Sequence, residues 1–165
     1  MAISVVISDD LLNFLKQHYE LDWFGLHGYY HWVRVRENGL RLAQINGANT
    51  KVVELFAFTH DIRRLSDGAD PQHGPRASQF IRSNMLNRLD LTKIELDILC
   101  EACETHTGGI RHHDLTVRTC WDADRLDLKR AGITPNPILL TTAEARSPAI
   151  IHWAMMRSLG KNGNS

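Results

Sequence analysis

The apolar residues of this chain recur at the spacing of helices. Leu11, Leu12 and Leu15 would share one face of a helix, and Ser8 ahead of them is a residue type that caps helix N-termini. The stretch from Val52 to Thr59 is almost wholly apolar, as in a buried helix. No segment alternates convincingly between apolar and polar residues, as strands do. The pattern therefore predicts an all-α fold.

Start and stop signals divide the rest of the chain into further helices. Thr92 with Glu95 three residues later forms a capping box, and Pro148 suits the first turn of a helix. Residues 66–75 are rich in Gly, Pro and Asp, which predicts a loop. We expect a bundle of about six helices, with helical segments starting near residue 8, covering about 28–45, 50–63, 76–89, 92–106 and 115–130, and starting again at 148.

The length of the chain, 165 residues, is enough to bury one sizeable core. No repeat and no linker divides the sequence, so we predict a single domain over residues 1–160. The polar end of the chain, residues 161–165, is predicted to be a disordered tail.

A polar dipeptide, His60-Asp61, follows the apolar run directly. Burying these groups without partners would cost several kcal/mol. One suitable partner is a divalent metal ion, because imidazole and carboxylate are both good ligands for first-row metals. The alternative is a hydrogen-bonded pair between helices, in which the aspartate fixes the tautomer of the histidine.

Other candidate ligands lie on other predicted helices. His27 and His31 are four residues apart and would share a helix face. His106 ends a later helix, and Asp122 and Asp124 lie on the next one. Nitrogen and oxygen ligands that point inward from several helices are a recurring way to hold a metal in a bundle.

The chain resembles the HD-domain metal-dependent phosphohydrolase superfamily, whose signature is H…HD…D on a helical core. The resemblance covers about residues 27–133 and rests on three segments in order, His31-x-x-Arg34-Val35, His60-Asp61 and Ala123-Asp124-Arg125-Leu126. It implies an all-α, HD-domain-like helical bundle whose metal ligands are His31, His60, Asp61 and Asp124. Asp122 competes for the place of the last ligand, but the Ala-Asp-x-Leu context of Asp124 matches the family better.

The resemblance leaves the number and identity of the metals open. Some members hold two metals, using further histidines between the HD dipeptide and the last aspartate, and His73 and His106 stand in the right order for this. His73, however, falls in the predicted loop, where a solvated side chain is common. The expected cofactor is a divalent transition metal (Mn, Fe, Co, Ni or Zn), with Mg as a further option.

The function that the resemblance implies is hydrolysis of a phosphate ester by a metal-activated water, in a phosphomonoesterase or a phosphodiesterase. Asp61 and Asp122 are the candidate catalytic bases, and Arg34 and His27 are the candidate substrate contacts. Two alternatives stay open. One is a dinuclear iron oxygenase of the same superfamily, and the other is a non-catalytic, ligand-binding regulatory module. The complete H…HD…D set argues against the second.

The net charge limits the kinds of partner that we expect, and the cysteine content indicates the cellular compartment. The formal net charge is zero, so nothing favours a membrane surface or a nucleic-acid polymer. We expect a small phosphorylated substrate, with a nucleotide among the options, and a homo-oligomer is compatible with the sequence. Three cysteines and no secretory leader favour the cytoplasm. Cys100 and Cys103 fall in a predicted helix, which favours buried apolar residues over a zinc site.

Overall fold

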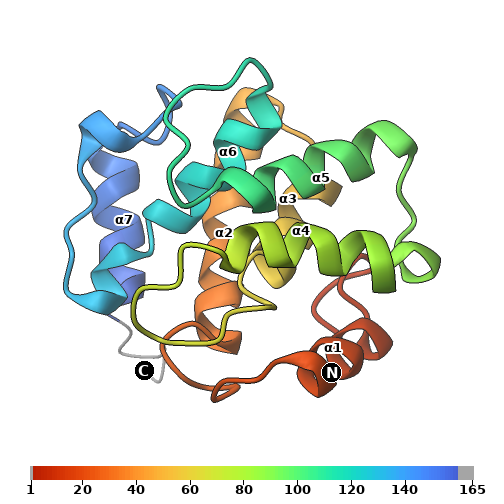
Figure 1. Ribbon diagram of the computed structural model, residues 1–165. Coiled ribbons are helices and arrows are strands. Elements are labelled where there is room, and N and C mark those ends of the chain that lie inside the picture. Colours follow the sequence, from red (N-terminus) through yellow and green to blue (C-terminus); the bar gives the residue numbers. More distant parts are fainter. Residues whose placement is uncertain (1, 160–165) are drawn as a thin grey trace.

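Seven α-helices and three short 3₁₀ helices form the regular structure of residues 2–159, the part of the chain that the computed structural model describes (Figure 1). No strand occurs among these residues, so the prediction of an all-α fold is confirmed. In chain order the elements are α1 (Asp9–His18), α2 (Tyr29–Asn46), α3 (Thr50–Thr59), α4 (His73–Asn84), η1 (Leu86–Arg88), α5 (Lys93–Thr105), α6 (Leu115–Arg125), η2 (Leu128–Ala131), η3 (Pro137–Leu139) and α7 (Pro148–Ser158).

The helices begin where capping side chains allow it. The Ser8 hydroxyl accepts a hydrogen bond from the amide of Leu11 at 3.2 Å, which satisfies a free donor at the start of α1. Thr92 and Glu95 form the complete capping box of α5. Gly47 follows α2 with a φ of 80°, a left-handed conformation that glycine adopts without strain.

Four helix boundaries differ from the predicted ones, and one of them is the end of α4, which lies at Asn84 rather than near residue 89. α3 ends at Thr59, and residues 60–63 continue as turns rather than as helix. α4 begins at His73, inside the segment predicted as a loop, because Pro75 is tolerated in a first helical turn, where amides have no partner within the helix. α6 ends at Arg125. Residue 160 and the tail predicted to be disordered, 161–165, lie outside the described residues.

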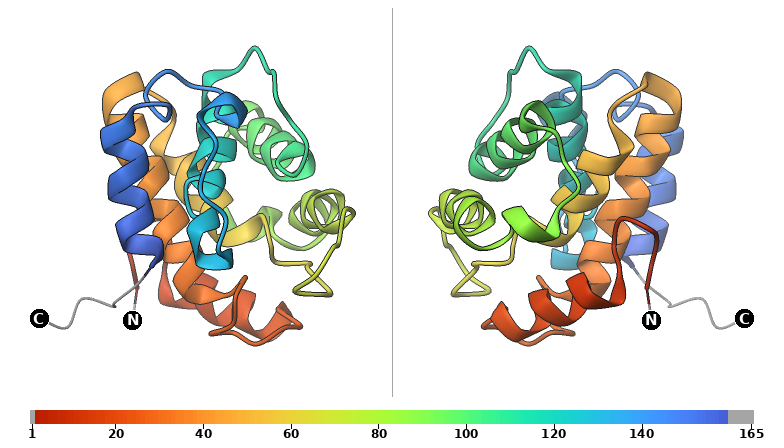
Figure 2. Two further views of the ribbon diagram at one scale, coloured as in Figure 1. Left: turned by 90° about the vertical axis from the view of Figure 1, so that its left-hand side faces the viewer. Right: turned by 90° about the vertical axis from the view of Figure 1, so that its right-hand side faces the viewer.

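The centre of the molecule is formed by α2, α3 and α6, which pack against one another. α5 lies across α3 and α6, and α4 packs on α5 (Figure 1). On the other side of the molecule α7 runs beside α2 and contacts η2 (Figure 2). Three central helices therefore have neighbours on several sides, and their ends can bring polar side chains into the interior.

The main core gathers buried apolar residues from α1 to α6, with Trp32, Phe56 and Trp121 among the largest. A smaller apolar cluster around Leu42 and Leu126 joins α2, the end of α6 and α7. No helix among the described residues combines the length and the apolar content that crossing a membrane requires.

The three cysteines are unpaired and fully buried in the main core, as predicted for small apolar residues. Burial raises the pKa of the Cys103 thiol far above its usual range, which keeps the group neutral. A neutral thiol is a poor metal ligand.

A close approach fixes the three central helices relative to one another. Gly39 of α2 lies where a β-carbon would stand 2.4 Å from Cγ1 of Val53 on α3 and 3.3 Å from Cβ of Ala123 on α6. Only glycine fits between these side chains without displacement. Residue 39 therefore sets the distance between α2 and its two neighbours.

Candidate metal centre

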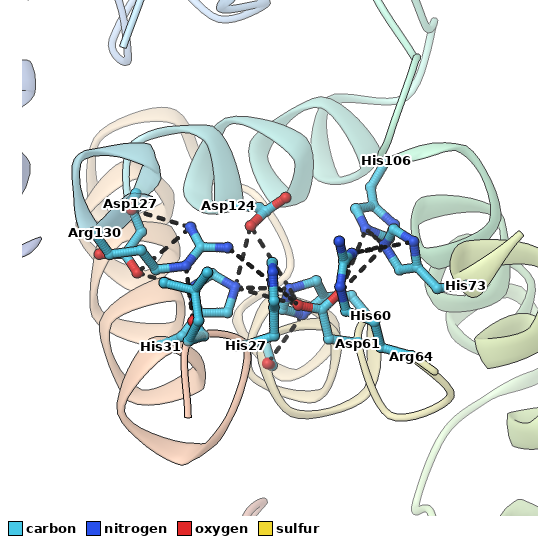
Figure 3. A network of polar contacts seen from close by, with 12 residues as sticks. His27, His31, His60, Asp61, Arg64, His73, His106, Asp124, Asp127 and Arg130 are labelled. Carbon is cyan, nitrogen blue, oxygen red and sulfur yellow. Dashed lines mark hydrogen bonds and ion pairs between the residues drawn. The ribbon is translucent and has the colours of Figure 1, made fainter. Parts of the chain in front are cut away.

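A cluster of four imidazoles and two carboxylates lies where five elements meet (Figure 3). All four histidines and Asp61 are buried, and the side chain of Asp124 is 19% exposed. The side chains come from α2, the end of α3, the start of α4, the end of α5, and α6. They are His31, His60, Asp61, His73, His106 and Asp124. The structure therefore brings together every metal ligand proposed from the sequence, including the two additional histidines.

The first half of the cluster contains His31 and His60, whose Nε2 atoms are 3.1 Å apart. Oδ2 of Asp61 lies 3.6 Å from Nε2 of His31 and 3.5 Å from Nε2 of His60. Oδ1 of Asp124 lies 3.3 Å and 3.7 Å from the same two nitrogens. Two nitrogens and two carboxylate oxygens thus surround one point.

The second half contains His73 and His106, whose Nε2 atoms are 2.8 Å apart. Oδ1 of Asp61 lies 3.1 Å from Nε2 of His73 and 4.0 Å from Nε2 of His106. Asp61 therefore directs one carboxylate oxygen to each histidine pair, and it connects the two halves of the cluster.

The tautomers of the four imidazoles follow from the atoms at their other nitrogens. In each ring Nδ1 faces an oxygen that can only accept a hydrogen bond, so Nδ1 carries a proton and, in the neutral form of the ring, Nε2 carries a lone pair. The acceptors are Asp127 Oδ2 for His31 (2.7 Å), Phe56 O for His60 (3.1 Å), Asp70 O for His73 (2.5 Å) and Cys103 O for His106 (2.6 Å).

This donor set fits a cation. Four lone pairs and two carboxylates converge at short distances, and lone pairs that face each other at 2.8 Å and 3.1 Å repel unless a positive charge lies between them. Imidazole nitrogen held by an acceptor behind the ring, together with carboxylate oxygen, is the usual environment of a first-row divalent ion. The buried cluster can therefore hold a metal ion.

The pKa shifts agree with ligands in their deprotonated forms. Burial lowers the pKa of His60 to about 3 and also lowers that of His106. Although burial opposes it, nearby histidines hold the pKa values of Asp61 and Asp124 well below their usual range. His73 is the exception, because the hydrogen bond and charge of Asp61 outweigh burial and raise its pKa.

A cavity of about 520 Å³ opens beside the cluster. Asp61, His73, His106 and Asp124 line one part of it, and His27, predicted as a substrate contact, lines it as well. His27 Nδ1 lies 3.3 Å from Asp61 Oδ2, so this side chain links the cavity wall to the candidate ligands. A small molecule in the cavity would therefore touch both.

Three arginines also line this cavity, and all three are engaged by the protein. Arg64 donates to the carbonyls of Ser66 and Gly68, and its Nη1 lies 3.6 Å from Asp61 Oδ1. Arg125 and Arg130 likewise donate to backbone carbonyls. The arginines thus supply positive potential to the cavity, while their donors are largely used elsewhere.

Asp122 and Arg34 lie outside the cavity, contrary to the roles predicted for them. Asp122 is fully buried, and its carboxylate accepts hydrogen bonds from Thr141 and Thr142 instead of facing the cluster. On an α-helix, residues two apart point to different sides, which separates Asp122 from Asp124. Arg34 donates to Asp127 at 2.7 Å and does not line the cavity.

Two contributors, Asp127 and Arg130, were not predicted from the sequence. Asp127 is fully buried and supports His31 from behind, and Arg130 donates to the carbonyl of Asp127 and lines the cavity. The i, i+3 spacing of acidic residues at Asp124 and Asp127 was a usable signal, since such residues share a helix face. No comparable signal marked Arg130.

No known family model matches the chain, and no curated protein matches it significantly. Among solved structures, a predicted HD superfamily hydrolase from an uncultured Thermotogales bacterium has a similar fold, with a TM-score of 0.68 and 22% sequence identity. The match covers 91% of this chain and 86% of that chain. The chain therefore shares the fold of that protein, and the predicted HD-domain-like helical bundle is confirmed as a fold.

Proposed function

We propose that this protein is a metal-dependent phosphohydrolase with a two-metal centre. The observation that carries the proposal is the orientation of the four imidazoles, whose Nε2 lone pairs meet in two pairs connected by Asp61. A fold shared with a protein named a predicted hydrolase supports the same reaction class. The three arginines that line the cavity suit an anionic substrate.

In this proposal His31, His60 and Asp124 hold one ion, His73 and His106 hold the other, and Asp61 contributes to both. A divalent ion bound there would lower the pKa of a water ligand and polarise a phosphoryl oxygen. The arginines would balance the charge of the phosphate, and His27 would contact the substrate at the cavity wall. Asp61 is the remaining candidate base, since Asp122 faces elsewhere.

The test begins with purification without chelator and elemental analysis. A panel of phosphate monoesters and diesters is then assayed with added Mn, Fe, Co, Ni, Zn or Mg. We expect about two metal ions per chain and phosphate release that depends on the metal. Asp124→Ala should remove at least the ion held by His31 and His60, together with the activity. Asp90→Ala, which changes a fully exposed aspartate, should remove neither.

The complete six-ligand set also supports a second candidate, a dinuclear iron oxygenase of the same superfamily. The same elemental analysis separates the two. If the protein holds two irons per chain and consumes oxygen without releasing phosphate, it is an oxygenase and not a phosphohydrolase.

A further inference from the structure

One wall of the cavity is apolar, and the ligand cluster does not account for it. Leu128, Leu139 and Leu140, which follow α6, line this wall, and Pro71 lines the cavity as well. Leu139 is 52% exposed and Leu140 only 1%, so the wall reaches from the surface to the interior. An apolar surface beside a charged centre is suited to a ligand with one anionic end and one apolar end.

The segment 139–142, which contains much of this wall, is held by charged side chains through its backbone. Three successive carbonyls of the segment each accept a hydrogen bond from a guanidinium group. The pairs are Leu139 with Arg125 (2.9 Å), Leu140 with Arg146 (2.8 Å) and Thr141 with Arg118 (3.2 Å). The segment has a fixed position although most of it lies outside any helix.

Asp122 completes this arrangement from α6. Its carboxylate accepts the amides of Thr141 at 2.8 Å and Thr142 at 2.7 Å, and it also accepts both threonine hydroxyls. A fully buried carboxylate is costly unless its oxygens are satisfied in this way. Because Asp122 and Asp124 share α6, one helix both carries a candidate ligand and holds the apolar wall.

We infer that the site takes phosphate esters whose alcohol is apolar, such as an aromatic ring, and that Asp122 is a positioning residue that holds Leu139 and Leu140 against that group. For binding of the substrate's phosphate group, the inference rests on the proposed function. The cavity, at about 520 Å³, has the size of a small-molecule site. The wall supplies the contact for the organic part, since the arginines of the cavity are bound to the backbone.

Binding of two phosphonates that cannot be hydrolysed tests the inference without requiring turnover. Phenylphosphonate and methylphosphonate are titrated by calorimetry into the metal-loaded protein. Burying the ring should make phenylphosphonate bind at least about tenfold tighter than methylphosphonate. Asp122→Asn should reduce this ratio and accelerate hydrogen exchange at the amides of Thr141 and Thr142. Leu139→Ala, at a half-exposed position that does not threaten folding, should also reduce the ratio.

The possible results distinguish a failure of this inference from a failure of the proposed function. If the wild type binds the two phosphonates with equal affinity, or if the affinity ratio is unchanged in both variants, the apolar wall does not bind the organic group. Neither result contradicts the proposed phosphohydrolase function. Binding of neither phosphonate overturns both. A preserved ratio in Asp122→Asn with reduced affinity for both ligands would show a general structural effect and would remove Asp122 as a positioning residue.

Discussion

At the scale of single residues, Asp61 is the group that joins the two histidine pairs. Its two oxygens face different pairs, and His27 and Arg64 approach it from the cavity side. A carboxylate in this place can balance the charge of two cations, which a neutral side chain of the same shape cannot do. The negative charge of Asp61 should therefore matter more than its size.

We predict that Asp61→Asn loses both metal ions while the helical circular-dichroism spectrum is kept. The amide has the same shape, but it places a donor among lone pairs and removes the shared charge. Elemental analysis after gel filtration measures the metal content. Asp90→Asn, at a fully exposed aspartate, serves as the matched control and should retain both ions. Retention of metal by Asp61→Asn would contradict the assignment.

Asp127 acts one step further from the cluster, through His31. Its carboxylate accepts the Nδ1 proton of His31 and also binds Arg34 and Ser158. Removing the hydrogen-bond acceptor behind a metal-binding histidine typically lowers metal affinity by about 10–100-fold. We predict a loss of that size for Asp127→Asn, measured by competition with a metal-binding dye. Ser158→Ala removes a different hydrogen bond from the same carboxylate and should change the affinity far less.

At the scale of helices, the cluster depends on the spacing of α2, α3 and α6. Gly39 sets this spacing through its contacts with Val53 and Ala123. Val53 lies on α3, which ends directly before His60, and Ala123 lies on α6 next to Asp124. Alanine at an exposed helical position would normally stabilise a protein by about 0.5–1 kcal/mol relative to glycine. Here the added methyl group would meet Val53 at 2.4 Å, so the usual gain should reverse.

We predict that Gly39→Ala destabilises the protein by about 1–3 kcal/mol, the cost of an overpacked core, and weakens metal binding. Urea unfolding with and without metal measures both effects. The double variant Gly39→Ala, Val53→Ala makes room for the methyl group and should recover part of the metal affinity. A single variant as stable as the wild type would show that the helices can separate without cost.

Much of the helical frame followed from the sequence because apolar spacing and capping residues are local signals. The start of α4 did not, since the Gly and Pro residues around His73 are typical of loops, and the close packing of Gly74 on Cys103 of α5 is visible only in the fold. Asp122 was misplaced for a related reason. Sequence shows that two aspartates are close, but only the fold shows that Thr141 and Thr142 approach one of them.

The HD-type ligands could be proposed from their order alone, whereas the backbone acceptors behind three of the four imidazoles could not. Asp127 and the carbonyls of Phe56, Asp70 and Cys103 fix the imidazole tautomers through contacts that bring distant segments together or use the backbone. Backbone acceptors leave no mark on the sequence. The candidate site was therefore predictable in its ligands and not in its support.

At the scale of the whole molecule, a bound metal pair would connect five elements that otherwise meet mainly through apolar contacts. The candidate ligands come from α2, the end of α3, α4, the end of α5, and α6, and their four Nε2 atoms and two carboxylates converge in the interior. Folding this cluster without metal brings two carboxylates and several nitrogen lone pairs together in the interior, which opposes the apolar contacts around it. Metal should thus bind the folded chain far better than the unfolded one.

We predict that removing the metal lowers the melting temperature by about 5–11 °C for each ion that is bound. Metal at 100 times its dissociation constant stabilises the folded state by about 2.7 kcal/mol, and each kcal/mol is worth about 2–4 °C in a chain of this size. Calorimetric scans before and after dialysis against chelator, and again after metal is restored, measure the shift. Asp61→Asn should melt at the same temperature in all three conditions. Identical wild-type scans would mean that the cluster binds no metal in the folded protein, because any ion held there must stabilise it.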